Sequence, residues 1–367
     1  MNPVDIIVPV YGSFHDARAA MESVLASGNI ADFRLVVIDD ASPEHFADFL
    51  GPLASHPKVL FHRNPVNLGF SATVNFGMAM HPDRDVVLLN SDALVYGDWL
   101  DRLNRILRDD PAVGTITPMS NAATILSYPL ECVDYGQPLE TSWRDIDLFC
   151  AQIAGDPIVI PTAIGFCMTI RRACLAQTGP FDAARFGRGY GEENDFCMRA
   201  KALGWKNVAA CNVFAWHRGA SSFKGDREGL SARAQKILAE LHPEYSRLVG
   251  DFRRRDPLAL LRAELDARRV RHAASGLLVV GDRPLGQVSG RPAIRLRPEG
   301  RNRWRFSFDS GEPLPNLRTF AADEPLAGIR QQLIRLNVAR VVVQKSARAP
   351  DALASAAELL GLPIFVD

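Results

Sequence analysis

The first part of the chain alternates short apolar runs with segments of helical spacing. Residues 5–10, 34–40 and 85–90 are rich in Val, Ile and Leu and have the length of strands that are covered on both faces. Residues 15–27 and 71–80 lie between these runs and carry apolar side chains at helical intervals. This strand–helix order predicts an α/β fold, with a mostly parallel sheet and helices on both of its faces.

The alternation continues to about residue 250. The pattern predicts further strands at 59–62, 163–171 and 208–216 and helices at 193–203 and 227–241. We therefore expect one domain over residues 1–250. A chain of 367 residues agrees with roughly two domains of about 150 residues each.

Beyond residue 250 the pattern changes. Residues 253–272 predict a single Arg-rich helix with leucines on one face, so we expect a connecting helix over 251–272. This helix either packs through its leucines, which is the commoner arrangement, or contacts an anionic membrane surface through its arginines. Residues 273–367 predict a smaller α/β unit, with strands at 276–280, 304–309, 339–344 and 363–366 and helices at 325–336 and 350–360.

The distribution of charge divides the chain at the same place. The formal net charge is +0, but residues 1–250 hold 22 Lys and Arg against 29 Asp and Glu, whereas residues 251–367 hold 20 against 13. This asymmetry indicates two units with different partners, and we expect no nucleic acid among them. The proportions of hydrophobic (47%) and charged (23%) residues are those of a globular protein and argue against long disorder.

The beginning of the sequence and its cysteines bear on the compartment. No apolar run reaches the roughly 18 to 20 residues that span a bilayer, and the first residues have neither a basic flank nor a cleavage site. The six cysteines form no CxxC pair, so they carry no zinc or redox signature and are expected as buried thiols. We therefore expect a cytoplasmic protein that contacts the inner membrane face at most peripherally.

Polar residues follow two of the apolar runs, at the strand ends where ligands of such sheets bind. Asp39 and Asp40 end the second run, either as an acidic turn or as acceptors of hydrogen bonds from a base or a ribose. Asn90, Ser91 and Asp92 follow a later run. A carboxylate there can hold Mg²⁺ or Mn²⁺ and bridge it to a diphosphate, although turns also favour these residue types.

Two later segments carry further candidate chemistry. Residues 187–195 combine three glycines with Glu192, Glu193 and Asp195 at a predicted helix start. These acids either complement the helix dipole or include a base that removes a proton from an attacking hydroxyl. His217 follows an apolar strand and is either a structural histidine or the partner of Asp92 in a metal site, with Arg218 or Lys224 facing phosphate.

Taken together, these segments resemble a known family. The sequences VDIIVPVYG, VVIDDAS, NLGFSATVNFGMA, VVLLNSDALV, GFCMTIRR, GRGYGEENDFCMRAKALGW and FAWHRGASSF, between about residues 3 and 225, are similar to the family 2 inverting glycosyltransferases with the GT-A fold. Bacterial rhamnosyltransferase-like members look most similar. The resemblance implies hexosyl or rhamnosyl transfer from a dTDP- or UDP-sugar to a glycan or lipid-linked acceptor, in the synthesis of surface polysaccharides such as O-antigen or capsule. The alternative is a nucleotide- or glycan-binding assembly module without transfer activity.

The resemblance also implies roles for individual residues. Glu193 matches the catalytic base, and Asp92 and His217 match ligands of a Mn²⁺ or Mg²⁺ ion. Asn90 stands where the family has a first acid, which leaves Asp92 as the carboxylate of that motif. The donor nucleotide is expected at Pro9, Tyr11, Asp40, Asn67, Gly69, Asn75 and Ser91, and the acceptor loop at Gly191, Glu192 and Asp195.

The end of the chain lies outside this resemblance. The segments GLLVVGDRPLG, LPNLRTFA and VARVVVQ are similar to the linker and first half of a nucleotide-sugar-binding GT-B domain. Since little sequence follows them, we expect a truncated or degenerate second module.

Overall fold

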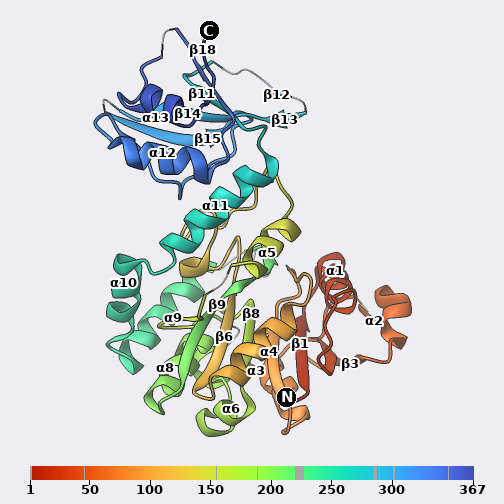
Figure 1. Cartoon of the computed structure of the whole chain (residues 1–367). Helices are drawn as coiled ribbons and strands as arrows, with labels where there is room; N and C mark the ends of the chain where they lie inside the picture. Colours follow the sequence, from red (N-terminus) through yellow and green to blue (C-terminus); the bar gives the residue numbers. More distant parts are fainter. Residues whose placement is uncertain are drawn as a thin grey trace. The chain divides into compact units, whose positions relative to one another are not determined.

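The computed structural model describes residues 2–44, 46–153, 155–187, 189–219, 227–283, 287–288, 290–300, 302–345 and 347–367. The chain forms two compact units (Figure 1). The N-terminal unit comprises Met1–Gly136 and Cys150–Pro257, and the C-terminal unit comprises Gln137–Phe149 and Leu258–Asp367. The C-terminal unit therefore includes a segment from the middle of the sequence.

The N-terminal unit is built on a mixed sheet with the strand order β3-β2-β1-β4-β8-β6-β9-β7. β1 to β4 run parallel to one another, as do β6 and β9, whereas β8 runs antiparallel to β4 and β6, and β7 antiparallel to β9. The expected mostly parallel sheet is thus confirmed. Its strands are β1 (Val4–Val10), β2 (Phe33–Asp39), β3 (Val59–Arg63), β4 (Asp85–Leu89), β6 (Val113–Met119), β7 (Ile158–Val159), β8 (Cys167–Ile170) and β9 (Lys206–Phe214). The short strands β5 (Ala93–Leu94) and β10 (Trp216–His217) pair beside it.

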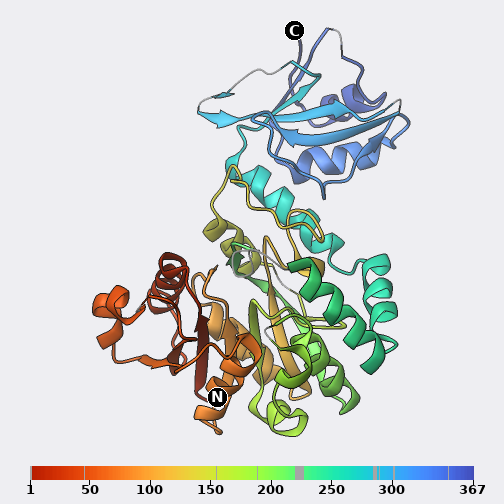
Figure 2. The ribbon, with the colours of Figure 1, turned by 180° about the vertical axis from the view of Figure 1, so that it is seen from behind.

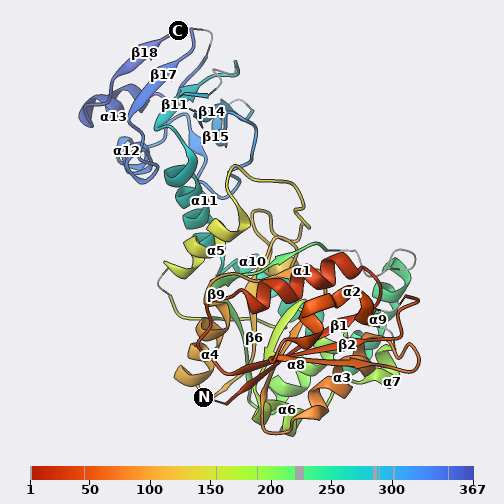
Figure 3. The same ribbon diagram turned by 90° about the vertical axis from the view of Figure 1, so that its right-hand side faces the viewer.

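Helices cover both faces of this sheet. The helices are α1 (Phe14–Leu25), α2 (Phe46–Leu50), α3 (Phe70–Met80), α4 (Trp99–Asp109), α6 (Arg172–Thr178), α7 (Ala183–Phe186), α8 (Glu192–Ala202), α9 (Arg227–Leu241) and α10 (Tyr245–Arg255), with 3₁₀ turns at Gly51–Ser55 and Thr124–Leu126. Side chains of α3, α6 and α8 share one apolar core with the sheet. Figure 3 shows α1 and α3 on opposite sides of β1 and β2. Consecutive residues Ile6, Ile7 and Val8 are fully buried because both faces of β1 are covered.

The C-terminal unit is a second, smaller α/β structure, as expected. Its main sheet has the order β16-β15-β14-β11-β17-β18, in which β14, β11, β17 and β18 run parallel and β15 and β16 complete an antiparallel edge (Figure 2). The elements are α5 (Trp143–Ala151), α11 (Ala259–Ala273), β11 (Leu277–Val280), β12 (Gln287–Val288), β13 (Arg291–Pro292), β14 (Ile294–Pro298), β15 (Arg303–Phe308), β16 (Phe320–Ala321), α12 (Leu326–Arg335), β17 (Arg340–Val343), α13 (Leu353–Leu359) and β18 (Ile364–Val366).

The single helix predicted over residues 253–272 is wrong. α10 ends at Arg255 and α11 begins at Ala259. The break is caused by Asp256, which adopts a left-handed conformation with a φ of 42°, and by Pro257, which has no N–H to continue a helix.

The leucines that follow the break, Leu258, Leu261 and Leu265, are buried, which agrees with the packing alternative for this region. None of the helices in the described ranges combines the length and the apolar composition of a membrane span.

Candidate functional site

A cavity of about 660 Å³ lies at the carboxyl ends of β1, β2 and β4. Its wall also includes the start of α8 and strand β10. Most of the side chains predicted from the sequence line this one cavity, namely Pro9, Tyr11, Asp40, Asn67, Gly69, Ser91, Asp92, Glu192, Glu193 and His217. We call it the strand-end cavity.

Asp40 fixes the loop that forms one side of the cavity. Its Oδ1 accepts hydrogen bonds from the Leu68 N–H and from Asn64 Nδ2, and its Oδ2 accepts one from the Gly69 N–H, each at 2.8 Å. A carboxylate offers about four acceptor positions, so three donors leave one position for a ligand. Asp39 points into the fold instead, where it binds the Ser42 N–H and pairs with Arg63.

Asp92 and His217 meet because β5 and β10 pair. His217 lies opposite Ala93 in this antiparallel pair, which places His217 Nε2 3.3 Å from Asp92 Oδ1. The imidazole Nδ1 lies 3.0 Å from the carbonyl oxygen of Ala122, and the ring stacks on Phe166. A neutral ring therefore donates from Nδ1 and keeps the lone pair of Nε2 toward Asp92.

The backbone of His217 is held by a residue that the sequence analysis missed. Asn121 accepts a hydrogen bond from the His217 N–H (2.8 Å) and donates one to the His217 carbonyl oxygen (2.7 Å). Burial lowers the pKa of His217, but the hydrogen bond and charge of Asp92 raise it more, so the pKa lies above its usual value. Asn121 thus holds the backbone of the residue whose imidazole lies beside Asp92.

The donor set of Asp92 and His217 fits a divalent cation that is shared with a substrate. Within the described residues, no group of three or more His, Cys, Asp or Glu side chains is placed to hold a metal ion. Mg²⁺ is nevertheless commonly held by only one or two carboxylates together with substrate phosphates, and imidazole suits transition metals. Asn90 lies next to the pair, with its Nδ2 3.4 Å from His217 Nε2.

Two adjacent glutamates form the wall contributed by α8. Glu192 is buried, with 4% of its surface exposed, and Glu193 is half-buried. Burial raises the pKa of both carboxyls, and the charge of Glu193 raises that of Glu192 further. Gly165 leaves room beside Glu193, since a Cβ there would lie 3.8 Å from Glu193 Cγ.

Gly191 has a structural role at the beginning of α8. Its φ is 92°, and a Cβ at this position would lie 2.8 Å from the Phe186 ring and 3.1 Å from the Cβ of Ala234. Gly191 therefore allows α9 to pack closely on the loop that precedes Glu192. It does not line the cavity itself.

Three further predicted residues lie elsewhere. Asn75 joins α3 to the backbone of Phe181, donating to its carbonyl oxygen (2.8 Å) and accepting from its N–H (3.0 Å). Asp195, expected in the acceptor loop, binds Arg199 and His242, each at 2.8 Å. Arg218 pairs with Asp16 at 2.7 Å. Lys224 lies outside the described residues.

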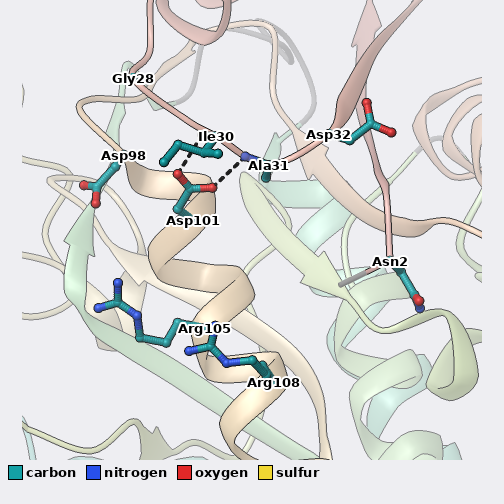
Figure 4. Close-up of a pocket in the computed structure, with 9 residues that line it drawn as sticks. All are labelled: Asn2, Gly28, Ile30, Ala31, Asp32, Asp98, Asp101, Arg105 and Arg108. Atoms are coloured by element: carbon teal, nitrogen blue, oxygen red, sulfur yellow. Dashed lines mark hydrogen bonds between the residues drawn. The ribbon is translucent and has the colours of Figure 1, made fainter.

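A second hollow, of about 570 Å³, lies near the amino ends of β1 and β2, beside α4 (Figure 4). Its central acid, Asp101, accepts hydrogen bonds from the N–H groups of Ile30 (2.7 Å) and Ala31 (2.9 Å). Arg105 and Arg108 line the same hollow from the next turns of the helix. It contains none of the predicted site residues, and the strand-end cavity remains the candidate site.

Comparison with known proteins gives a match to one family and similarities of fold. Residues 5–179 match the model of the family described as Glycosyl transferase family 2. The fold is similar to that of GalNAc-T7 solved with UDP, GalNAc and Mn²⁺ (14% identity, TM-score 0.50, covering 67% of this chain and 50% of that one). It is also similar to that of S. aureus TarS 1–349 solved with UDP-GlcNAc (13% identity, TM-score 0.50, covering 74% and 81%). Identities this low show the fold alone.

Two curated relatives are similar over part of their length. An uncharacterized glycosyltransferase of Rickettsia felis is 24% identical over 163 residues, which is 44% of this chain and 25% of the relative. An uncharacterized protein of Sinorhizobium fredii is 24% identical over 227 residues, which is 56% of this chain and 23% of the relative. The chain thus spans about a quarter of the length of these relatives.

Proposed function

We propose that the chain is an inverting glycosyltransferase, because residues 5–179 match the model of glycosyl transferase family 2 and the N-terminal unit has the GT-A fold. It moves a sugar from a nucleotide-diphosphate donor, a dTDP- or UDP-sugar, to a hydroxyl of a glycan or lipid-linked acceptor in the synthesis of a bacterial surface polysaccharide. One observation carries the proposal: Asp40, the pair Asp92 and His217, and Glu193 line the same cavity.

The donor nucleoside binds beside the ends of β1 and β2 in this proposal. Asp40 has one acceptor position left after its three hydrogen bonds, which suits an N–H of a base or a hydroxyl of a ribose. Tyr11 is 55% exposed and lines the same cavity, so its ring is available to stack on a planar base. Pro9 completes this wall.

The diphosphate binds near Asp92 and His217, which would hold Mn²⁺ or Mg²⁺ together with phosphate oxygens. When bound, such an ion stabilises the charge that develops on the departing diphosphate. The similar fold of GalNAc-T7 was solved with UDP and Mn²⁺, which supports testing Mn²⁺ first. Asn121 holds the His217 backbone and thereby orients the imidazole toward Asp92.

Glu193 removes the proton from the acceptor hydroxyl in this mechanism. The oxygen then attacks the anomeric carbon from the face opposite the leaving diphosphate, which inverts the configuration. Burial raises the pKa of Glu193 and so makes its ionised form a stronger base than an exposed glutamate. A general base of this kind contributes typically about 10²–10⁴ in rate.

The experiment is a donor screen with a metal-ligand variant. Hydrolysis and nucleotide binding are measured for UDP-, dTDP- and GDP-sugars with Mn²⁺ and with EDTA. We expect at least one donor to be hydrolysed in Mn²⁺, and Asp92→Ala to lose the Mn²⁺-dependent part of the nucleotide affinity. Wild-type affinity that is the same with and without EDTA would contradict the metal site, and binding without turnover of any donor would favour a non-catalytic binding module.

A further inference from the structure

Glu192 is a buried carboxyl that has no role in the proposed reaction. It lines the strand-end cavity with 4% of its surface exposed, and its Oε2 has no hydrogen-bond partner among the described residues. The next residue, Glu193, presents a second carboxyl to the same cavity. An ionised carboxylate buried in this way is unfavourable, because it has lost its water and faces a like charge.

The neutral form of Glu192 removes both of these costs. The pKa of Glu192 is raised well above its usual value, first by burial and then by the charge of Glu193. Two neighbouring carboxyls of this kind share one proton, and the more deeply buried one keeps it. A protonated carboxyl has one hydroxyl donor that an ionised carboxylate lacks.

We propose that Glu192 works as a neutral carboxylic acid whose hydroxyl donates a hydrogen bond to a hydroxyl oxygen of an uncharged sugar in the strand-end cavity. Glu192 is then a specificity-determining residue, and Glu193 remains the base. The inference rests on the proposed glycosyl transfer for its substrate but not for the protonation state, which can be measured without substrate.

This arrangement also selects the class of sugar. A wall that holds the ionised Glu193 beside a buried acid repels a carboxylate, so uronic acids are excluded and neutral hexoses and deoxyhexoses are admitted. Among the described residues, the titratable groups beside this wall include Asp195 and His242, which bind each other, Tyr245 and Cys197. Those that line the same cavity are Tyr11, Asp40, Asp92, Asp134, Tyr190 and His217.

The protonation state is tested first, by infrared difference spectroscopy of the full chain at neutral pH without substrate. We expect the carbonyl band of a protonated carboxyl in the wild type and in Glu193→Gln, and its loss in Glu192→Gln. The matched control is Glu240→Gln, an exposed glutamate of α9, which should leave the band unchanged. A spectrum in which Glu192→Gln removes only carboxylate absorption would overturn the proposal.

The hydrogen bond is tested by kinetics with the donor that the screen identifies. Hydrolysis reports binding of the donor sugar, and transfer to p-nitrophenyl glycosides reports binding of the acceptor. Leu at this position cannot donate a hydrogen bond. Glu192→Leu should therefore raise either the KM of the donor or the KM of the acceptor by about 10-fold or more, which is typical of a lost hydrogen bond in a buried site. Glu192→Gln keeps an uncharged hydrogen-bond donor, the amide NH₂. It should raise the logarithm of the same KM by less than half of the rise that Glu192→Leu causes.

The outcomes separate this inference from the proposed function. If wild type hydrolyses no donor, the proposed function fails, while the infrared result still decides the protonation state. If wild type transfers sugar but Glu192→Leu and Glu192→Gln raise KM equally, the carboxylate and not the acid binds the sugar, and the inference fails alone. If UDP-glucuronic acid is used as well as UDP-glucose, the selection against anionic sugars is wrong. Each variant is compared with wild type for its thermal midpoint, and Glu192→Met replaces Glu192→Leu if the latter does not fold.

Discussion

Replacement of Glu193 by Gln should slow sugar transfer by at least about 100-fold and leave donor binding intact. Gln has the size of Glu, and Gly165 leaves the side chain unhindered, since even a Cβ at residue 165 would lie 3.8 Å from Glu193 Cγ. The wall of the cavity therefore keeps its shape, and only the basicity is lost. General-base catalysis contributes about 10²–10⁴ in rate, which corresponds to about 2.7–5.4 kcal/mol at about 1.36 kcal/mol per factor of ten.

The pH dependence gives a second measurable consequence of the same residue. Burial raises the pKa of Glu193, and the base works only when ionised. Wild-type kcat should therefore be full at pH values above this raised pKa and should fall as the pH is lowered through it. The acid limb should lie above the pKa of about 4.3 that an unperturbed glutamate shows.

The assay measures kcat for transfer and, separately, the dissociation constant of the nucleoside diphosphate by calorimetry. Glu193→Gln should lower kcat by at least about 100-fold with an unchanged dissociation constant, whereas the exposed control Glu240→Gln should change neither. Near-normal transfer by Glu193→Gln, together with an inactive Asp195→Asn, would show that the base has been assigned to the wrong residue.

Two further substitutions test how the cavity is held in shape. Asp40→Asn retains only one acceptor oxygen for three donors. It should lower the free energy of unfolding in urea by about 1.5–3 kcal/mol and weaken nucleotide binding. Unchanged stability would show that the loop from Asn64 to Gly69 does not depend on Asp40. Asn121→Ala should lose both hydrogen bonds to the His217 backbone and lower the free energy of unfolding by about 1–3 kcal/mol. It should also reduce the Mn²⁺-dependent part of the nucleotide affinity. An Mn²⁺ dependence equal to that of wild type would show that Asn121 does not support the metal site.

Features that depend on local patterns could be predicted from the sequence. The apolar runs identified β1, β2 and β4, and the polar residues that end them meet in one cavity because parallel strands present their carboxyl ends at one edge. The break between α10 and α11 is also local. Pro257 stands inside the segment that we predicted as one helix, and the absence of its N–H was a sufficient signal.

Features that depend on distant partners could not be predicted. Asn75 belongs to a segment of the resemblance but binds the backbone of Phe181, 106 residues away. Glu140 pairs with the buried guanidinium of Arg269, 129 residues away, within the C-terminal unit. Neither residue carries a local signal for its partner, because hydrogen-bond donors and acceptors of this kind are common throughout the sequence.

Two carboxyls of the strand-end cavity, Asp40 and Glu192, differ in the number of hydrogen-bond donors that surround them. Asp40 accepts hydrogen bonds from two backbone N–H groups and an amide, which leaves one acceptor position of its carboxylate for a ligand. Glu192 is buried and, within the described ranges, has an oxygen without any donor; burial, and after it the charge of Glu193, raises its pKa. In the proposed reaction the nucleoside therefore binds at an acid that is supplied with donors, and the sugar binds at an acid that is not. An added donor beside Glu192 would ionise it and remove the hydrogen bond that we assign to the sugar.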